Sequence, residues 1–224
     1  MIKKFAFVHT SHVLISTFGD LAKRLLPGIE VVHLTDESLI KNTIQEGRLS
    51  KATTRRLFGM IESAHMGGAD AVMVTCSSIG PGVNVARELV DFPIFRVDEA
   101  MALKAVTMGP RIGVAATLQT TLEPTIALLK STAAEAGQAV EIVPRIADGA
   151  FQAVLSGNTE QHDRIVMEML SALKEEVDVV VLAQASMARV VPLLPAGGAP
   201  ILSSPELAVR HAQSVLMEGK SLAS

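Results

Sequence analysis

Several residue types that mark particular classes of protein are scarce or absent in this chain of 224 residues. It has a single cysteine, so it can form no internal disulfide, and we expect an intracellular, cytoplasmic protein. It has neither tryptophan nor tyrosine and only seven phenylalanines. The core must therefore be aliphatic, and the aromatic platforms on which nucleic-acid bases stack are missing.

Long apolar runs and a charge excess are missing as well. No apolar segment approaches the roughly 20 residues that a membrane span needs, and the apolar start is too short for a signal peptide. The net charge is −3 and there is no basic run, so we expect neither a membrane nor a nucleic-acid partner. No Cys/His/Asp spacing indicates a metal site, and no glycine-rich phosphate loop indicates a dinucleotide or ATP.

Short apolar runs alternate with helical patterns along the whole chain. The runs are continuous rather than alternating, which is typical of strands in a parallel sheet covered on both faces. Helical patterns such as 50–66, 118–136 and 160–175 lie between them, the last behind a cap at Asn158 and Thr159. This order predicts a doubly wound α/β fold. The eight runs are 5–10, 29–34, 69–76, 92–97, 111–116, 139–144, 177–183 and 199–202.

An internal repeat gives this fold two halves. Four residues recur further along the chain at nearly the same sequence offset. The alternative is a chance likeness, because any two βαβ stretches look alike, but chance does not require a common offset. We predict one α/β half formed by residues 1–97 plus 205–224 and a second formed by 98–204. A ligand site is expected between them, where the carboxyl ends of both sheets meet. The four pairs are Val8 with Val114, Asp70 with Asp178, Pro93 with Pro200, and Glu99 with Glu206.

The cysteine lies in a polar loop directly after a strand. Cys76 follows the apolar run at Thr75 and precedes Ser77, Ser78 and a Gly-Pro-Gly sequence. Backbone N–H groups at the following helix start would bind a carboxylate and lower the pKa of the thiol. A thiolate there could take a proton from carbon or attack as a nucleophile. The alternative is a buried cysteine that acts as a small apolar residue.

Each half also begins with a second polar loop. His9, Thr10 and Ser11 follow the first strand, and residues 117–121 follow the first strand of the second half. Their hydroxyl and N–H groups could hold a carboxylate, or they could only cap helices. His9 ends its strand, so we expect it to tune Cys76 or to carry a proton. Of the other histidines, His12 is expected to pack against a loop and His33 to line the site, whereas His65, His162 and His211 are expected at the surface.

The stretches VMVTCSS (72–78), IGVAATLQTT (112–121) and VVVLAQASMA (179–188) resemble the aspartate/glutamate/hydantoin racemase superfamily. The resemblance covers essentially the whole chain. It implies two pseudosymmetric halves, no cofactor, a homodimer, a small carboxylate substrate and a place in amino acid metabolism. It makes Cys76 the acid/base or nucleophile. The substrate-binding residues that we predict are Thr10, Ser11, Thr75, Ser77, Ser78, Thr117, Thr120, Thr121, Ala185 and Ser186.

One position departs from the family pattern. Hydantoin-type racemases have a second cysteine where this chain has Gln184, which aligns with Cys76 in the internal repeat. An amide neither gives nor takes a proton near neutral pH, so the two-thiol mechanism cannot operate unchanged. Gln184 could still hydrogen-bond a substrate oxygen or a developing enolate. A second proton carrier would have to be Ser186 or His9.

These observations predict a cofactor-independent isomerase that acts on a small carboxylate with Cys76, Gln184 and His9 as catalytic residues. A decarboxylase or lyase of the same superfamily, with one catalytic cysteine, is the first alternative. A non-catalytic protein that binds small carboxylates is the second.

Overall fold

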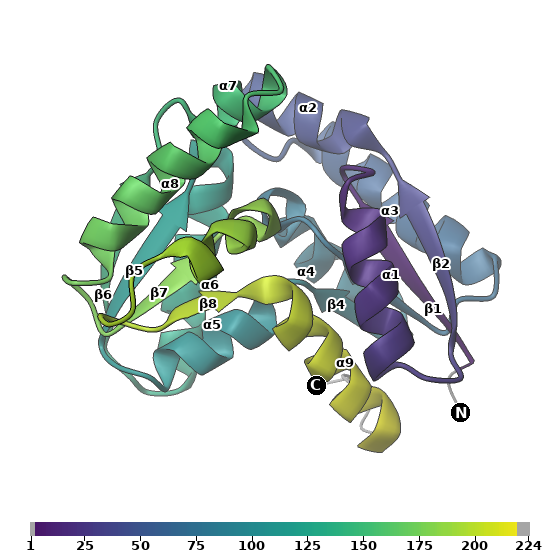
Figure 1. The fold of residues 1–224 in the computed structure, drawn as a ribbon. Helices are drawn as coiled ribbons and strands as arrows, with labels where there is room; N and C mark the ends of the chain where they lie inside the picture. Colours follow the sequence, from purple (N-terminus) through teal and green to yellow (C-terminus); the bar gives the residue numbers. More distant parts are fainter. Residues whose placement is uncertain (1–2, 219–224) are drawn as a thin grey trace. The chain divides into compact units, whose positions relative to one another are not determined.

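The computed structural model describes residues 3–218 (Figure 1). Contacts divide the chain into two compact units: unit 1 is Met1–Asp98 with Pro205–Ser224, and unit 2 is Glu99–Ser204. Each unit contains one four-stranded parallel sheet flanked by helices, which confirms the predicted α/β class. Among the described residues, no helix combines the length and apolarity needed to cross a membrane.

Unit 1 has the strand order β2-β1-β3-β4, and all pairs are parallel. Its third strand ends two residues before the cysteine, which leaves Cys76 in the loop at the carboxyl end of the sheet. The elements are β1 (Lys4–His9), α1 (Leu14–Leu25), β2 (Glu30–Thr35), α2 (Glu37–Glu46), α3 (Lys51–Met66), β3 (Ala71–Val74), the 3₁₀ helix η1 (Ser77–Ile79), α4 (Pro81–Arg87), β4 (Ile94–Arg96) and α9 (Ser204–Glu218).

Unit 2 repeats this order as β6-β5-β7-β8, again with parallel pairs only. All eight apolar runs of the sequence therefore form strands. The elements are α5 (Glu99–Val106), β5 (Arg111–Ala116), α6 (Gln119–Glu135), β6 (Glu141–Ile146), α7 (Ala150–Leu155), α8 (Thr159–Leu173), β7 (Val179–Leu182), the 3₁₀ helix η2 (Ala185–Leu193) and β8 (Ile201–Ser203).

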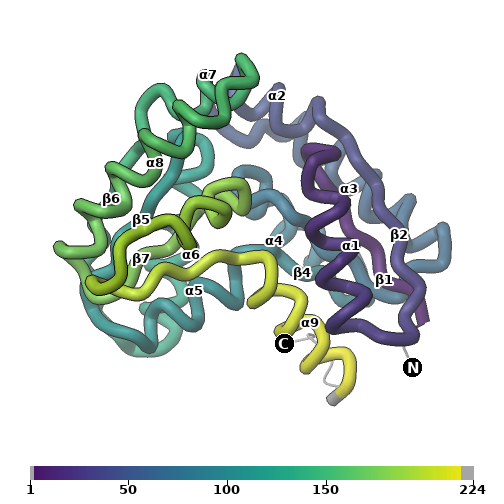
Figure 2. The backbone as a smooth tube through the Cα atoms, in the orientation of Figure 1, coloured from purple at the N-terminus to yellow at the C-terminus, as the bar shows by residue number. Residues whose placement is uncertain are grey.

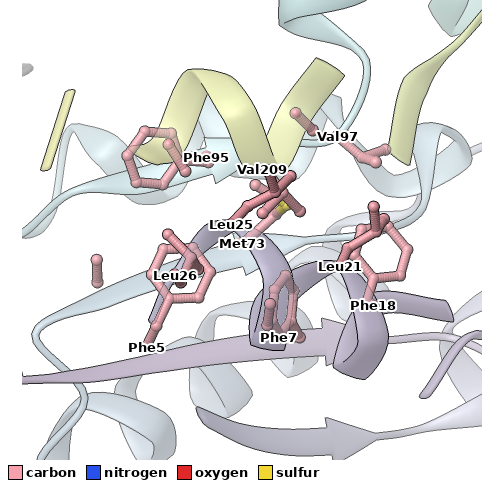
Figure 3. Close-up of a cluster of buried hydrophobic side chains, with 14 residues drawn as sticks. Phe5, Phe7, Phe18, Leu21, Leu25, Leu26, Met73, Phe95, Val97 and Val209 are labelled. Atoms are coloured by element: carbon pink, nitrogen blue, oxygen red, sulfur yellow. The ribbon is translucent and has the colours of Figure 1, made fainter. Parts of the chain in front are cut away.

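Helix α9 completes the core of unit 1 although it comes last in the chain. Figure 2 shows the yellow end of the chain returning to the purple helix α1. Its Val209 lies beside Leu25 and Met73 in a cluster that also contains Phe5 and Phe7 (Figure 3). A second apolar cluster, on the opposite face of the sheet, includes Leu57 of α3 and Val83 of α4. Because both faces are covered, strands β1, β3 and β4 are almost completely buried, as their continuous apolar sequences predict.

Strands β2 and β6 differ from this expectation. Each lies at one edge of its sheet, and most of its residues are partly or fully exposed. Their sequences mix polar with apolar residues for this reason. Helices α7 and α8 pack on one side of the second sheet, whereas α5 and α6 contact each other and its central strands. The predicted cap of α8 is confirmed, because the Asn158 side chain accepts the N–H of Gln161.

The repeat is visible in individual hydrogen bonds. The Asp70 carboxylate accepts the N–H groups of Lys3 and Lys4 at the start of β1, and Asp178 accepts the N–H of Arg111 at the start of β5. The strand registers correct one predicted pair. Val8 lies opposite Val74, and the residue in the same place in unit 2 is Ala115, opposite Leu182, rather than Val114.

Candidate functional site

Cys76 lies at the N-cap of η1, at the carboxyl end of the sheet of unit 1. The residue as a whole is partly exposed, whereas its sulfur is desolvated. The sulfur receives hydrogen bonds from the N–H groups of Ser78 and Ile79 and from the hydroxyls of Thr10 and Ser78. The structure thus brings together three residues that the sequence predicts for the site, and they come from the loops after β1 and β3.

The expected low pKa of this thiol is wrong. Burial removes the thiolate from water and raises the pKa of Cys76, and this effect exceeds that of the four hydrogen bonds, which lower it. A helix start and polar neighbours in the sequence indicate only the lowering contribution. The extent of desolvation depends on how the surrounding chain packs, which a local sequence pattern does not contain. Cys76 therefore rests as a thiol near neutral pH.

The side chain of His9 is hydrogen-bonded in a buried network of Thr75 and His33 rather than to the sulfur of Cys76. Its Nδ1 lies 2.8 Å from the Thr75 hydroxyl and its Nε2 lies 2.8 Å from Nδ1 of His33. The Thr75 hydroxyl donates to the carbonyl of Val8, so it accepts the proton on Nδ1 of His9. Nε2 of His9 is then unprotonated and accepts from Nδ1 of His33. Thr75 is 3% exposed and points into this network.

The charge state of His9 follows from this burial. The side chain is fully buried, and desolvation together with the charge of His33 lowers the pKa of His9 to about 4. His9 is therefore neutral at pH 7, and both of its ring nitrogens are used inside unit 1. A proton carrier needs a free nitrogen and a pKa near the working pH, so this environment does not suit that role. Desolvation also lowers the pKa of His33.

One histidine was placed wrongly by its sequence pattern. His162 was expected at the surface, but it is 2% exposed and lies with Val166 and Leu170 on the inner face of α8. Its Nδ1 is 2.8 Å from the carboxylate of Asp163, which also binds Arg189. His12 pairs at the surface with Glu37.

In unit 2, Gln184 binds Thr117. Oε1 of Gln184 accepts the backbone N–H of Thr117 at 2.6 Å and its hydroxyl at 3.1 Å, and Nε2 of Gln184 lies 2.8 Å from the same hydroxyl. These two residues follow β5 and β7, so the amide connects two adjacent strand ends. The predicted residues Ala185 and Ser186 come next in η2, where Ala185 is partly exposed and Ser186 is exposed.

Within residues 3–218, the start of α6 has an unpartnered hydrogen-bond donor. The helix begins after Leu118, whose side chain cannot cap it, and the carbonyl of Leu118 accepts the N–H groups of Thr121 and Leu122. The Thr120 hydroxyl, buried in the first turn, has no hydrogen-bond partner among the described residues. Thr121 is buried in the same turn and its carbonyl accepts the hydroxyl of Thr125. A buried hydroxyl without a partner at the N-terminus of a helix is suited to an anion such as a carboxylate.

The other predicted residues lie around the cysteine. Thr10, Ser77 and Ser78 are buried and Ser11 is partly exposed. Within residues 3–218, no group of three His, Cys, Asp or Glu side chains is arranged to hold a metal ion.

Two further residues near the cysteine loop were missed from the sequence. Arg96 and Asp98 form a buried ion pair beside Gly80, four residues after Cys76. The available signal was the pair of opposite charges at the end of a strand that is otherwise apolar.

A protein-family model covers most of the chain. The family model described as Asp/Glu/Hydantoin racemase matches residues 9–212. A search of curated protein sequences finds no significant match to the chain.

Solved structures share the fold at low sequence identity. Glutamate racemase isoform RacE1 from Bacillus anthracis has a TM-score of 0.77 and 16% identity, over 99% of this chain and 84% of that one. Allantoin racemase from Klebsiella pneumoniae has a TM-score of 0.71 and 20% identity, over 99% of this chain and 90% of that one. An aspartate racemase homologue from Pyrococcus horikoshii has a TM-score of 0.70 and 11% identity, over 96% and 100%. With a family match over most of its length, this chain belongs to the Asp/Glu/hydantoin racemase family.

Proposed function

We propose that the protein is a cofactor-independent isomerase in which Cys76 transfers a proton at the α-carbon of a small carboxylate. The observation that carries this proposal is the environment of the sulfur. Two backbone N–H groups and the Thr10 hydroxyl donate to it at the N-terminus of η1. Such donors stabilise the negative charge that the sulfur carries while the proton is on the substrate.

The raised pKa of Cys76 has two consequences for this chemistry. Only a small fraction of the enzyme holds the thiolate at neutral pH, but that thiolate is a stronger base than one with an ordinary pKa. In the forward step the C–H bond breaks, an S–H bond forms, and the electron pair moves into the carboxylate to give an enediolate. Return of a proton to carbon regenerates the thiolate.

Unit 2 carries its own candidate group for a carboxylate, at the first turn of α6. The Thr120 hydroxyl has no partner among the described residues, so it can donate to an anionic oxygen, and an enediolate carries more charge on its oxygens than the carboxylate does. Donors of this kind favour the intermediate over the substrate. We assign Thr120 to this role ahead of Thr121, whose backbone N–H already donates to the carbonyl of Leu118.

A decarboxylase or lyase is the second candidate, and a specific observation favours it. Cys76 rests as a thiol, which can give a proton to a carbanion, and the residue at the second cysteine position, Gln184, is bonded to Thr117. Loss of CO₂ from a malonate-like substrate leaves a carbanion that needs one proton from one side. Such a reaction needs no second acid or base.

The test is exchange with solvent deuterium, followed by proton NMR, on a panel of carboxylates. The panel contains both enantiomers of aspartate and of glutamate, a hydantoin, maleate and an arylmalonate, each with the wild type, Cys76→Ala and the surface control Ser131→Ala. We expect exchange or conversion with the wild type and Ser131→Ala, and none with Cys76→Ala. Exchange without inversion indicates one-sided chemistry, and CO₂ release indicates the second candidate.

Turnover that survives in Cys76→Ala would contradict a role for the thiol. If all three proteins bind a carboxylate in a titration but convert nothing, the non-catalytic binding protein replaces both enzymatic candidates. The homodimer stays a prediction, and light scattering in solution tests it.

A further inference from the structure

Arg96 is a buried cation at the carboxyl end of the sheet of unit 1. It is the last residue of β4 and lies opposite Val74 of β3, the strand that leads to the cysteine. Its side chain is 3% exposed and that of Asp98 is fully buried. The two form a bidentate pair, with Nε 3.1 Å from Oδ1 and Nη2 3.0 Å from Oδ2. Asp98 therefore neutralises the guanidinium and fixes its plane.

The guanidinium lies against the backbone of Gly80. A Cβ atom at this position would be 2.6 Å from Nη2 and 2.8 Å from both Cζ and Nε of Arg96. Gly80 has a φ of −50° and a ψ of −42°, which any residue adopts in a helix. The glycine is thus needed for space and not for an unusual conformation. Contact with three atoms of one guanidinium group means that the face of the group packs on the chain.

Gly80 joins the cysteine loop to α4. Its N–H donates to the carbonyl of Ser77 at 3.0 Å, and its own carbonyl accepts the N–H of Val83 at 2.9 Å. The N–H groups that face the sulfur belong to Ser78 and Ile79, the two residues directly before Gly80. A displacement of Gly80 would therefore change the direction of these two donors.

We propose that Arg96, held in place by Asp98, positions the Cys76 loop by packing its guanidinium plane on Gly80. Arg96 is a positioning residue here, because it acts through the backbone and not on the substrate. A flat and rigid group suits this contact, whereas lysine has no such plane. The buried charge is tolerated because Asp98 pairs with it. The importance of this contact for catalysis rests on the proposed function of Cys76, but its effect on the thiol does not.

The single cysteine permits a test that needs no substrate, since iodoacetamide can alkylate only one thiol in the whole chain. The alkylation rate is measured between about pH 7 and 11 and reports the thiolate. The variants are Gly80→Ala, Arg96→Lys and the double variant. The controls are Gly59→Ala, where a Cβ would meet no atom within 4 Å, and Arg55→Lys, which is exposed on α3. Circular dichroism confirms that each variant is folded.

We expect Gly80→Ala to move the pH profile upward by about one pH unit, which is about a tenfold smaller thiolate fraction on its lower limb. Gly59→Ala should match the wild type. In the Arg96→Lys background, Gly80→Ala should shift the pH profile much less, because the guanidinium group with which the new methyl group would clash is absent. Arg96→Lys alone should move the profile in the same direction, and Arg55→Lys should leave it unchanged.

Two results would overturn the proposal. One is a Gly80→Ala profile identical to that of Gly59→Ala. The other is a double variant whose fold-change in alkylation rate equals the product of the fold-changes of the two single variants. That result would mean that Gly80 and Arg96 act independently. If Gly80→Ala does not fold, the pH profile of Arg96→Lys is compared with that of Arg55→Lys. Identical profiles for these two variants overturn the proposal. Failure of the proposed function would instead be seen as turnover by Cys76→Ala, with these profiles unaffected.

Discussion

The amide of Gln184 accepts the backbone N–H of Thr117 at 2.6 Å and joins the ends of strands β5 and β7. The same two places in unit 1 are occupied by Thr10 and Cys76, and there the threonine hydroxyl donates to the sulfur. The repeat therefore keeps a contact between the two strand-end loops in both units. In unit 1 that contact involves an ionisable thiol, and in unit 2 it involves an amide that does not ionise.

Removal of the Gln184 amide should destabilise the protein. In Gln184→Ala the N–H of Thr117 loses its partner, and we expect the free energy of unfolding to fall by about 1–2 kcal/mol. Urea denaturation measures the change. Gln119→Ala is the matched control, since the Gln119 amide donates to Glu123 at the surface, and its loss should change stability by less than about 0.5 kcal/mol. Equal stability of the two variants would show that the contact with Thr117 contributes nothing.

A thiol at position 184 should change the outcome of the reaction. Gln184→Cys restores the residue that hydantoin-type racemases have at this place in their sequence. With a substrate that exchanges its α-proton without inversion in the wild type, we expect inversion to accompany exchange in this variant. Polarimetry or chiral chromatography follows the product. Gln184→Ser is the control, because serine is similar in size to cysteine but a much weaker acid. Inversion by Gln184→Ser would contradict the idea that the new thiol carries the second proton.

The stability of the protein should fall in mild acid because of His9. The pKa of His9 is about 4 in the folded chain and 6.5 for the ordinary side chain, so the unfolded chain binds the proton more readily between these values. The contribution of neutral His9 is complete above pH 6.5 and disappears as the pH falls toward 4. It amounts to about 3 kcal/mol.

Urea denaturation of the wild type at pH 7 and at pH 4.5 measures this loss. His9→Asn keeps a donor near Thr75 but does not titrate, so it should lose less stability on acidification than the wild type does. His12→Asn removes an exposed histidine that pairs with Glu37 and should behave as the wild type. If His9→Asn loses as much unfolding free energy between pH 7 and pH 4.5 as the wild type does, groups other than His9 cause the acid sensitivity.

Replacement of Thr120 should separate stability from binding. Its buried hydroxyl has no partner among residues 3–218, so Thr120→Val should keep or raise the free energy of unfolding, by up to about 1 kcal/mol. The same variant should weaken carboxylate binding about tenfold, because one donor to the anion is lost. Calorimetric titration and urea denaturation give the two values.

Thr125→Val is the control for this variant. Thr125 donates to the carbonyl of Thr121 in the same helix, so its replacement should lower stability and leave carboxylate binding unchanged. Loss of stability in Thr120→Val would mean that the hydroxyl has a stabilising role in the protein without ligand. Unchanged binding would remove Thr120 from the proposed site.

Much of the fold could be predicted from local sequence. The eight apolar runs specify strands of parallel sheets, although β2 and β6 at the sheet edges are less buried than predicted. The recurrence of Asp70 as Asp178 indicates two similar units. The position of Cys76 at a strand end follows from the same pattern. Helix α8 shows the limit, since His162 lies on its inner face although a histidine is usually assigned to the surface.

Contacts distant in the sequence decided the properties of the candidate site. His9 is neutral because folding removes it from water and places it beside His33, 24 positions away, while Thr75, 66 positions away, bonds its other nitrogen. Gln184 is bonded to a residue 67 positions away, and Gly80 meets a guanidinium from the next strand. The sequence by itself determined the strands, the repeat and the place of the single cysteine, because these depend on periodicity and residue type. Only the tertiary structure decided which groups are desolvated, paired or free, because desolvation and hydrogen bonding depend on neighbours that the chain brings together when it folds.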